Sequence, residues 1–196
     1  MKTKKFTTSQ LTILGLMAGI LFLMAYTPLG YLNIGPLAVT FNVIPVAVCA
    51  IVLGPTGGAI AGAVFGLTSF MQAIGIGGVS ALGSALFQIN PFMTAVQCFG
   101  PRILDGICIG FIYRAVHKKA NTYVSCAVTG FFSAFLNTLF FMTALIVMFG
   151  NTELIRNLMG GHNIIVGCCL MVGVNAISEM VSSTITVSYT HLTLPT

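Results

Sequence analysis

Long apolar stretches, each closed by a short polar or turn-forming segment, follow one another along most of the chain. A helix needs roughly 20 such residues to cross about 30 Å of hydrocarbon. Six stretches qualify, over residues 7–26, 37–53, 58–74, 96–113, 122–149 and 163–187. The pattern therefore predicts an all-α fold, a polytopic membrane bundle of six transmembrane helices that forms one domain over residues 1–187.

The composition excludes a water-soluble protein. The 196 residues are 57% hydrophobic and 6% charged, whereas about a quarter of the residues of a soluble domain are charged. The net charge of +5 indicates no nucleic-acid partner, because the basic residues gather at the ends of apolar stretches, where the lipid bilayer is their expected neighbour. The cysteines form no CxxC pair, so we expect small buried side chains and no metal site.

The distribution of positive charge predicts the orientation in the membrane. Six of the eight Lys and Arg residues lie in the N-terminal tail or in residues 114–119. Cytoplasmic loops carry an excess of such residues, so both termini are predicted to be cytoplasmic and segments 27–36, 75–90 and 150–162 to face outward. Residues 188–196 are a polar, Pro-terminated string, which we interpret as a cloning or adaptor scar outside the domain.

Polar side chains inside the predicted spans are the candidates for function, because an ionisable group in hydrocarbon costs several kcal/mol unless it is paired or hydrated. They are Arg102, Asp105, Asn137, Asn175 and Glu179. At about 1.5 Å per residue, the arginine and the two asparagines share a depth in the outer half, roughly 18 to 22 Å above the inner ends of their spans. Asp105 and Glu179 lie about one turn lower. Asp105 shares a helix face with Arg102, and Glu179 shares one with Asn175; we expect these two faces to meet.

Two interpretations of these residues stay open. In the first, Arg102 and the asparagines hold a small polar solute in a cavity, and the carboxylates orient the arginine. In the second, Arg102 neutralises Asp105 or Glu179, and Asn137 joins two helices. No phosphate-binding loop, H-E-x-x-H motif or nucleophile elbow occurs, so we expect no enzyme activity and no cofactor.

Small residues spaced by four, which let helices approach closely, recur in three predicted spans. Those in the third and fourth spans are expected to serve packing inside the bundle; they are Gly58, Gly62, Gly66, Gly106 and Gly110. In the first span, the face formed by Gly15, Ala18 and Gly19 could equally meet another subunit.

Short motifs within and between the predicted spans, together with the segment from Gly62 to Ser69, form a set that covers nearly the whole chain up to about residue 187. They are Thr27-Pro28-Leu29-Gly30-Tyr31 with Gly35-Pro36, Ile44-Pro45-Val46, Leu53-Gly54-Pro55, Pro101-Arg102-Ile103-Leu104 with Tyr113-Arg114, Asn137-Thr138 and Asn175-Ala176-Ile177-Ser178-Glu179. The set resembles the substrate-binding S components of energy-coupling factor (ECF) transporters, and it is most similar to the branch that contains pantothenate transporters.

The resemblance implies a bacterial cell-membrane protein that captures a water-soluble vitamin at its outer side, with pantothenate expected first and folate or a similar micronutrient as an alternative. It implies docking, through the small-residue face at Gly15 and Gly19, on a transmembrane coupling subunit that works with two cytoplasmic ATPases. It also places the binding site at the first and third external loops and the outer halves of helices four to six, where Arg102, Asn137 and Asn175 lie. A self-contained secondary carrier is the competing class, although the sequence shows no convincing internal repeat.

Overall fold

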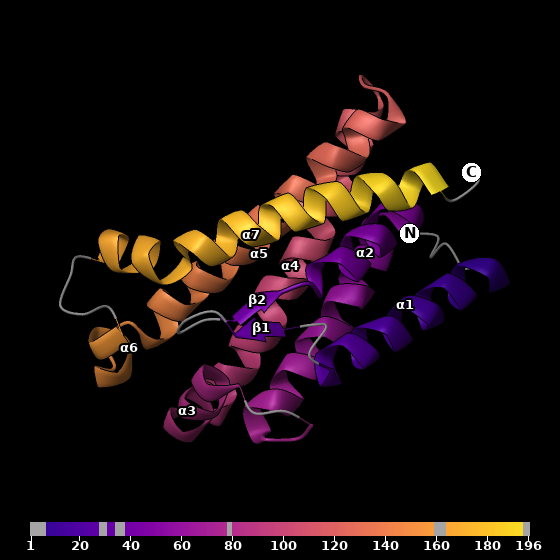
Figure 1. The fold of residues 1–196 in the computed structure, drawn as a ribbon. Coiled ribbons are helices and arrows are strands. Elements are labelled where there is room, and N and C mark those ends of the chain that lie inside the picture. Colours follow the sequence, from indigo (N-terminus) through magenta and orange to yellow (C-terminus); the bar gives the residue numbers. More distant parts are fainter. Residues whose placement is uncertain (1–6, 28–30, 34–37, 78–79, 159–163, 194–196) are drawn as a thin grey trace, which may run out of the picture.

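The structure is a computed structural model that describes residues 7–27, 31–33, 38–77, 80–158 and 164–193. Within these ranges the chain forms seven helices and one short antiparallel ribbon (Figure 1). In chain order they are α1 (Thr8–Tyr26), β1 (Tyr31–Asn33), β2 (Ala38–Thr40), α2 (Val43–Ile74), α3 (Ala81–Ile89), α4 (Pro91–His117), α5 (Thr122–Phe149), α6 (Glu153–Leu158) and α7 (Ile164–Thr193). Apart from this ribbon and the connecting turns, the described chain is helical, in agreement with the predicted helical class.

Four helices are long and apolar enough to cross a membrane, counting only the described residues: α1, α2, α4 and α5. The first and fifth predicted spans match α1 and α5 closely. The fourth begins earlier than predicted, because Asn90 caps α4 with its side-chain oxygen, which accepts hydrogen bonds from the N–H groups of Phe92 and Met93 at 3.1 and 3.2 Å, and Pro91 suits the first helical position.

The second and third predicted spans lie in α2, where the chain reverses direction at Gly54. This glycine has φ 76° and ψ −167°, a conformation that other residues rarely adopt. Val46 and Cys49 before the bend belong to the same buried cluster as Ala61 and Phe65 after it. The two arms of α2 therefore lie side by side as an antiparallel hairpin.

The prediction of a helical span over 37–53 was wrong at its start. Residues 38–40 form strand β2, which pairs antiparallel with β1 so that Tyr31 faces Thr40 and Asn33 faces Ala38. A short apolar run does not distinguish a strand from a buried helix by its pattern alone. The first arm of α2 is consequently only about 16 Å long at 1.5 Å per residue.

Glycines bring α2 and α4 into backbone contact. A methyl group at Gly58 would overlap the carbonyl of Gly106, and one at Gly62 would overlap the carbonyl of Arg102. The predicted packing role of these small residues is thereby confirmed. The contact at Gly62 also fixes the backbone that carries Arg102.

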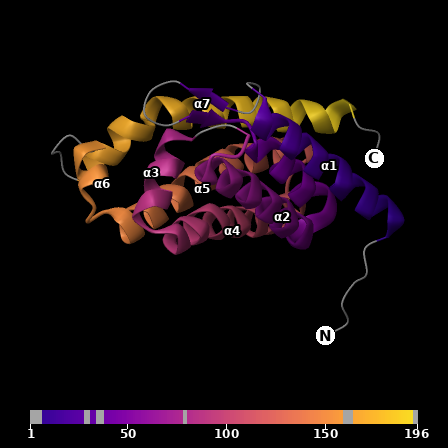
Figure 2. The ribbon, with the colours of Figure 1, turned by 90° about the horizontal axis from the view of Figure 1, so that it is seen from below.

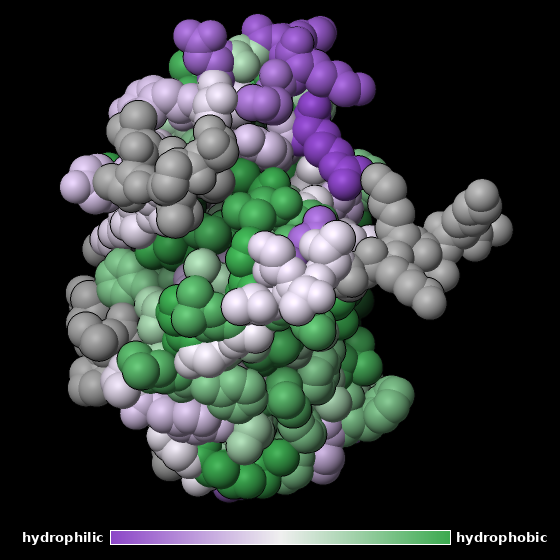
Figure 3. Space-filling model, turned by 90° about the vertical axis from the view of Figure 1, so that its right-hand side faces the viewer, coloured by the Kyte–Doolittle hydropathy of each residue, from purple (hydrophilic) through white to green (hydrophobic). Residues whose placement is uncertain are grey.

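The two ends of the bundle differ in structure. The start of α1, the turn between α4 and α5 and the end of α7 lie toward one end, and α3 and α6 lie toward the other (Figure 1). The Arg114 guanidinium contacts Gly54, so the reversal of α2 also lies at the α4–α5 end. Figure 3 shows hydrophilic residues gathered at this end above a broad hydrophobic surface.

Helices α3 and α6 occupy segments that the sequence analysis treated as external loops. Leu86 of α3 packs with Leu145 and Phe149 of α5 and with Ile155 of α6 in a small buried cluster. Ser80 supports the start of α3, because its side-chain oxygen accepts a hydrogen bond from Gly83 N–H at 3.2 Å. The last helix, α7, continues to Thr193, past the predicted end at residue 187; the interpretation of residues 188–196 as a scar stays a prediction.

Candidate functional site

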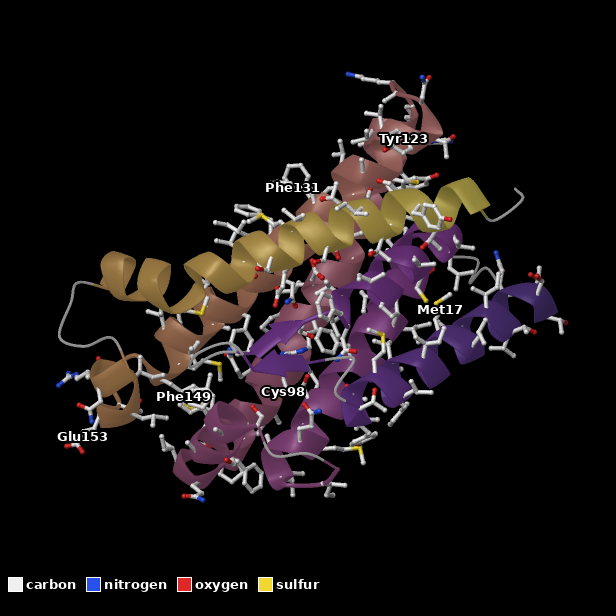
Figure 4. All side chains as sticks on the ribbon, viewed as in Figure 1. Met17, Cys98, Tyr123, Phe131, Phe149 and Glu153 are labelled. Carbon is white, nitrogen blue, oxygen red and sulfur yellow. The ribbon has the colours of Figure 1, made fainter. Side chains whose placement is uncertain are left out.

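Arg102 of α4 is turned toward the N-terminal end of its helix by its own neighbours. Pro101 has no N–H, so the carbonyl of Gln97, four residues earlier, lacks its usual helical partner. Arg102 Nη1 donates to this carbonyl at 3.4 Å and to the carbonyl of Cys98 at 3.1 Å. Cys98 lies near the centre of the molecule in Figure 4.

Two aromatic rings flank the guanidinium. Its central carbon lies 4.6 Å from the ring centroid of Phe65 in α2 and 5.3 Å from that of Phe141 in α5, distances at which a cation is attracted to a ring face. Nη1 is used by the two carbonyls, whereas Nε is buried without a hydrogen-bond partner among the described residues. No hydrogen bond joins Nε or Nη2 to another described residue, and this is the edge through which arginine binds a carboxylate with two parallel hydrogen bonds.

Neither candidate carboxylate forms an ion pair with Arg102 within the described part of the chain. Asp105 is 2% exposed, and its Oδ1 has no partner among the residues described. Both Asp105 and Glu179 nevertheless lie within Coulombic range of the guanidinium. The interpretation in which one of them neutralises Arg102 by direct pairing is not what the structure contains.

Glu179 of α7 instead connects three elements. Its Oε1 accepts a hydrogen bond from the backbone N–H of Thr40 in β2 at 2.7 Å, and its Oε2 accepts one from the hydroxyl of Thr138 in α5 at 3.5 Å. A buried carboxylate needs such donors because its desolvation is costly. The ribbon is thus held against α5 and α7.

The expectation that the polar faces of α4 and α7 meet directly needs correction. Figure 2 shows α5 between these two helices, and both helices pack extensively against α5. The connection runs through α5, where Phe141 faces Arg102 and Thr138 faces Glu179. Sequence depth placed these groups at similar levels but could not show which helix stands between them.

The structure describes the side chain of Asn137 but not that of Asn175. Asn137 is 7% exposed and forms no hydrogen bond with any described residue, so the interpretation in which it joins two helices has no support in the described contacts. Asn175 lies in helix α7, one turn before Glu179. Its side chain lies outside the described residues.

Sequence reasoning missed two buried amides. Asn42, immediately before α2, is 0% exposed, and neither its Oδ1 nor its Nδ2 has a partner in the described structure. Gln97 donates from Nε2 to the carbonyl of Phe141 at 2.8 Å, while its Oε1 is unpartnered among described residues. In the sequence, both residues are uncharged amides inside or beside an apolar run. The prediction considered charged groups and two other asparagines, and did not include these amides.

The small-residue face of α1 is open. Gly15 and Gly19 are exposed, and a methyl group added to either would meet nothing within 4 Å, while Ala18 is half-buried. The helix packs on α2 through other residues, including Leu21 and Met17, and Figure 4 shows Met17 between the two helices. Within the described chain, this face does not serve internal packing.

Comparison with known proteins identifies the relatives of the chain. A family model described as "ECF transporter, substrate-specific component" matches residues 9–189. The chain is 32% identical over 172 residues to the pantothenate transporter PanT of Leuconostoc mesenteroides subsp. mesenteroides, covering 84% of this chain and 78% of the relative. It is 28% identical over 162 residues to the pantothenic acid transporter PanT of Lactococcus lactis subsp. cremoris, covering 76% and 78%.

Proposed function

Because the chain belongs to the substrate-specific components of ECF transporters, we propose that it captures a water-soluble vitamin at the outer side of the bacterial cell membrane. Pantothenate is the first candidate, because two relatives carry the names pantothenate transporter and pantothenic acid transporter. Uptake is then driven by a separate ATP-hydrolysing module. The chain itself acts as the binding subunit.

The observation that carries the proposal is the unpaired edge of Arg102. Pantothenate has a carboxylate at one end, and a buried guanidinium with two adjacent free donors is complementary to it. The rings of Phe65 and Phe141 strengthen this interaction by excluding water from the faces of the guanidinium. In the proposed complex the carboxylate occupies this edge.

The remaining polar candidates receive supporting roles in the proposal. Asn137 and Asn175 bond the hydroxyl or amide groups of the solute. Asp105 and Glu179 act on Arg102 through their charge and help to orient it. The first and third external segments close over the solute, and the bond from β2 to Glu179 supports such a role for the first.

We further propose six membrane spans with both termini in the cytoplasm. The hairpin of α2 supports two antiparallel passes, because its arms run in opposite directions. The first helical arm, about 16 Å long, covers only part of the hydrocarbon thickness. The chain is proposed to dock on a transmembrane coupling subunit, associated with two ATPases, through the α1 face at Gly15, Ala18 and Gly19. The open space beside both glycines supports this assignment.

Replacing Arg102 with Gln tests the carboxylate assignment. We expect binding of pantothenate to weaken by about 2 kcal/mol or more, because one partner of a buried charged hydrogen bond is lost. Affinity is measured in detergent for pantothenate and for its neutral alcohol analogue. The wild-type protein should prefer the acid, and the variant should lose this preference.

Lys119→Gln is the matched control, because Lys119 is exposed in the turn between α4 and α5, away from every segment of the proposed site. It should bind both ligands as the wild type does, and thermal unfolding of both variants shows whether they are folded. Equal affinity of the wild-type protein for acid and alcohol contradicts the carboxylate assignment. Loss of folding in Arg102→Gln, without a change of preference, assigns the arginine a structural role.

A further inference from the structure

Asn42 is a buried amide whose hydrogen-bonding capacity is unused. It is 0% exposed, and both its Oδ1 and its Nδ2 lack partners among the described residues. Buried polar side chains are nearly always hydrogen-bonded, because an unpaired group loses its hydration without compensation. No described residue of the chain provides a partner for this side chain.

Asn42 does not cap helix α2 with its side chain. Asparagine before a helix commonly caps the first turn, with extended backbone dihedrals and its side-chain oxygen on the free N–H groups. Asn42 has φ −64° and ψ −15° and makes no side-chain capping bond, whereas Asn90 caps α4 in this way. The side chain of Asn42 is thus not required for starting α2.

Contacts on either side of Asn42 place it beside the proposed site. On one side, the hydroxyl of Ser133 in α5 donates to the carbonyl of Val43 at 3.4 Å. On the other, Thr40 N–H donates to Glu179, which also accepts from Thr138.

Asn137 lies one turn beyond Ser133 along α5 and is next to Thr138. Asn42 and Asn137 therefore lie within about one helical turn of each other along the contact between α2 and α5. Val43 packs in the same cluster as Phe65, the ring beside the Arg102 guanidinium.

We propose that Asn42 is a ligand-binding residue that recognises a secondary amide of the solute, next to the carboxylate held by Arg102. A carboxamide has a donor in its NH₂ group and an acceptor in its oxygen. The N–H and C=O of a trans secondary amide point in opposite directions, so Asn42 pairs with one of them, and its Oδ1 would accept from the N–H. Pantothenate carries one secondary amide between its carboxylate and its hydroxyl groups. The inference rests on the proposed function and adds a determinant of specificity.

The test compares pantothenate with an analogue in which an ester oxygen replaces the amide nitrogen. A site built to bond an N–H group discriminates against a ligand that lacks it, so the wild-type protein should prefer the amide. In Asn42→Leu, which keeps the size of the side chain, affinity for pantothenate should fall about tenfold or more, the scale of a lost hydrogen bond and an unpaired ligand group. The preference for amide over ester should disappear, while the preference for acid over alcohol is retained.

Asn121→Leu is the matched control, because Asn121 also precedes a helix without a side-chain capping bond but is exposed at the other end of the bundle. It should leave both preferences unchanged. Thermal unfolding of the ligand-free Asn42→Leu protein should occur at the wild-type temperature or above it, since two unpaired buried polar atoms are removed. If this variant does not fold, Asn42→Ala replaces it, because alanine offers the solute neither a donor nor an acceptor.

The outcomes distinguish a failure of the role proposed for Asn42 from a failure of the proposed substrate. An unchanged preference for amide over ester in a folded Asn42 variant overturns the role of Asn42 and leaves pantothenate binding intact. If the wild-type protein binds pantothenate but does not distinguish it from the ester, the role of Asn42 is likewise overturned. Absence of pantothenate binding by the wild-type protein overturns the proposed substrate together with this inference.

Discussion

At the scale of single residues, Pro101 determines where Arg102 points. The missing N–H of proline leaves the Gln97 carbonyl without a helical donor, and the arginine supplies one from Nη1. Half of the guanidinium is thereby fixed by the helix itself, and the other edge is presented without an internal ion pair in the described chain. A receptor that is held in place before the ligand arrives loses little side-chain entropy on binding.

Glu179 provides a test of how the β-ribbon is held. We expect the free energy of unfolding of Glu179→Leu to be about 1 to 3 kcal/mol lower than that of Glu179→Gln, because only Gln keeps an acceptor for the buried Thr40 N–H. Thermal or denaturant unfolding in detergent measures the difference. Thr138→Val is the control; it removes only the longer hydrogen bond, at 3.5 Å, and should change stability by less than about 1 kcal/mol. Equal stability of the Leu and Gln variants would show that the ribbon does not depend on this bond.

At the scale of elements, the hairpin of α2 forms the base on which α4 is placed. Its second arm presents glycines to the backbone of α4, and close approach without side chains increases van der Waals contact between membrane helices. One of these glycines, Gly62, lies opposite the residue that carries the guanidinium. Packing between the two helices and the position of Arg102, the proposed ligand-binding residue, are therefore coupled.

Gly62→Ala should destabilise the protein and also weaken binding of pantothenate. The added methyl overlaps the carbonyl of Arg102, and overpacking of this kind costs about 1 to 3 kcal/mol. Gly15→Ala is the matched control in another helix: it meets open space and gains helix propensity, so unfolding and affinity should stay at wild-type values or improve. If both variants are equally stable, the contact between α2 and α4 is looser than the structure shows.

At the scale of the whole molecule, the described chain buries its polar groups in the centre and leaves one side of α1 open. Leu16 and Leu23 are exposed on the same helix as Gly15 and Gly19. Lipid can cover such a surface, and so can a helix of another subunit, which the two glycines would allow to approach closely. The proposed division into a binding subunit and a separate motor requires a docking surface of this kind.

Gly15→Leu and Gly19→Leu should abolish coupled uptake in the assembled transporter and leave binding by the isolated chain intact. The bulky side chains prevent close approach of a partner helix but meet no described residue of this chain. Uptake of labelled pantothenate by cells and affinity in detergent are measured together. Gly173→Leu is the control, an open glycine on α7, and should retain uptake.

Simultaneous loss of binding and uptake in the α1 variants would assign this face to packing within the chain. Transport by the purified chain alone, without the coupling subunit and the ATPases, would favour a self-contained carrier over the proposed arrangement.

The sequence by itself determined the class of the molecule and its family. The length and low charge of each apolar run are local properties, and they suffice to predict membrane helices because an unpaired backbone or charge is costly in hydrocarbon. The family motifs are likewise short and contiguous, and the match over residues 9–189 confirms the family that they indicated. Arg102 was singled out for the same reason, as a charge inside an apolar run.

Only the tertiary structure decided which polar groups become partners. Thr40 and Glu179 are 139 positions apart in the chain, and no periodicity within a span relates them. Residues 38–40 are a strand because β1 supplies the backbone hydrogen bonds that a helix would have formed internally. Asn42 stands out only because the surrounding helices exclude water and give its amide no partner among the described residues. Hydrogen-bond satisfaction depends on which elements meet, and this is settled by packing between segments that are distant in the sequence.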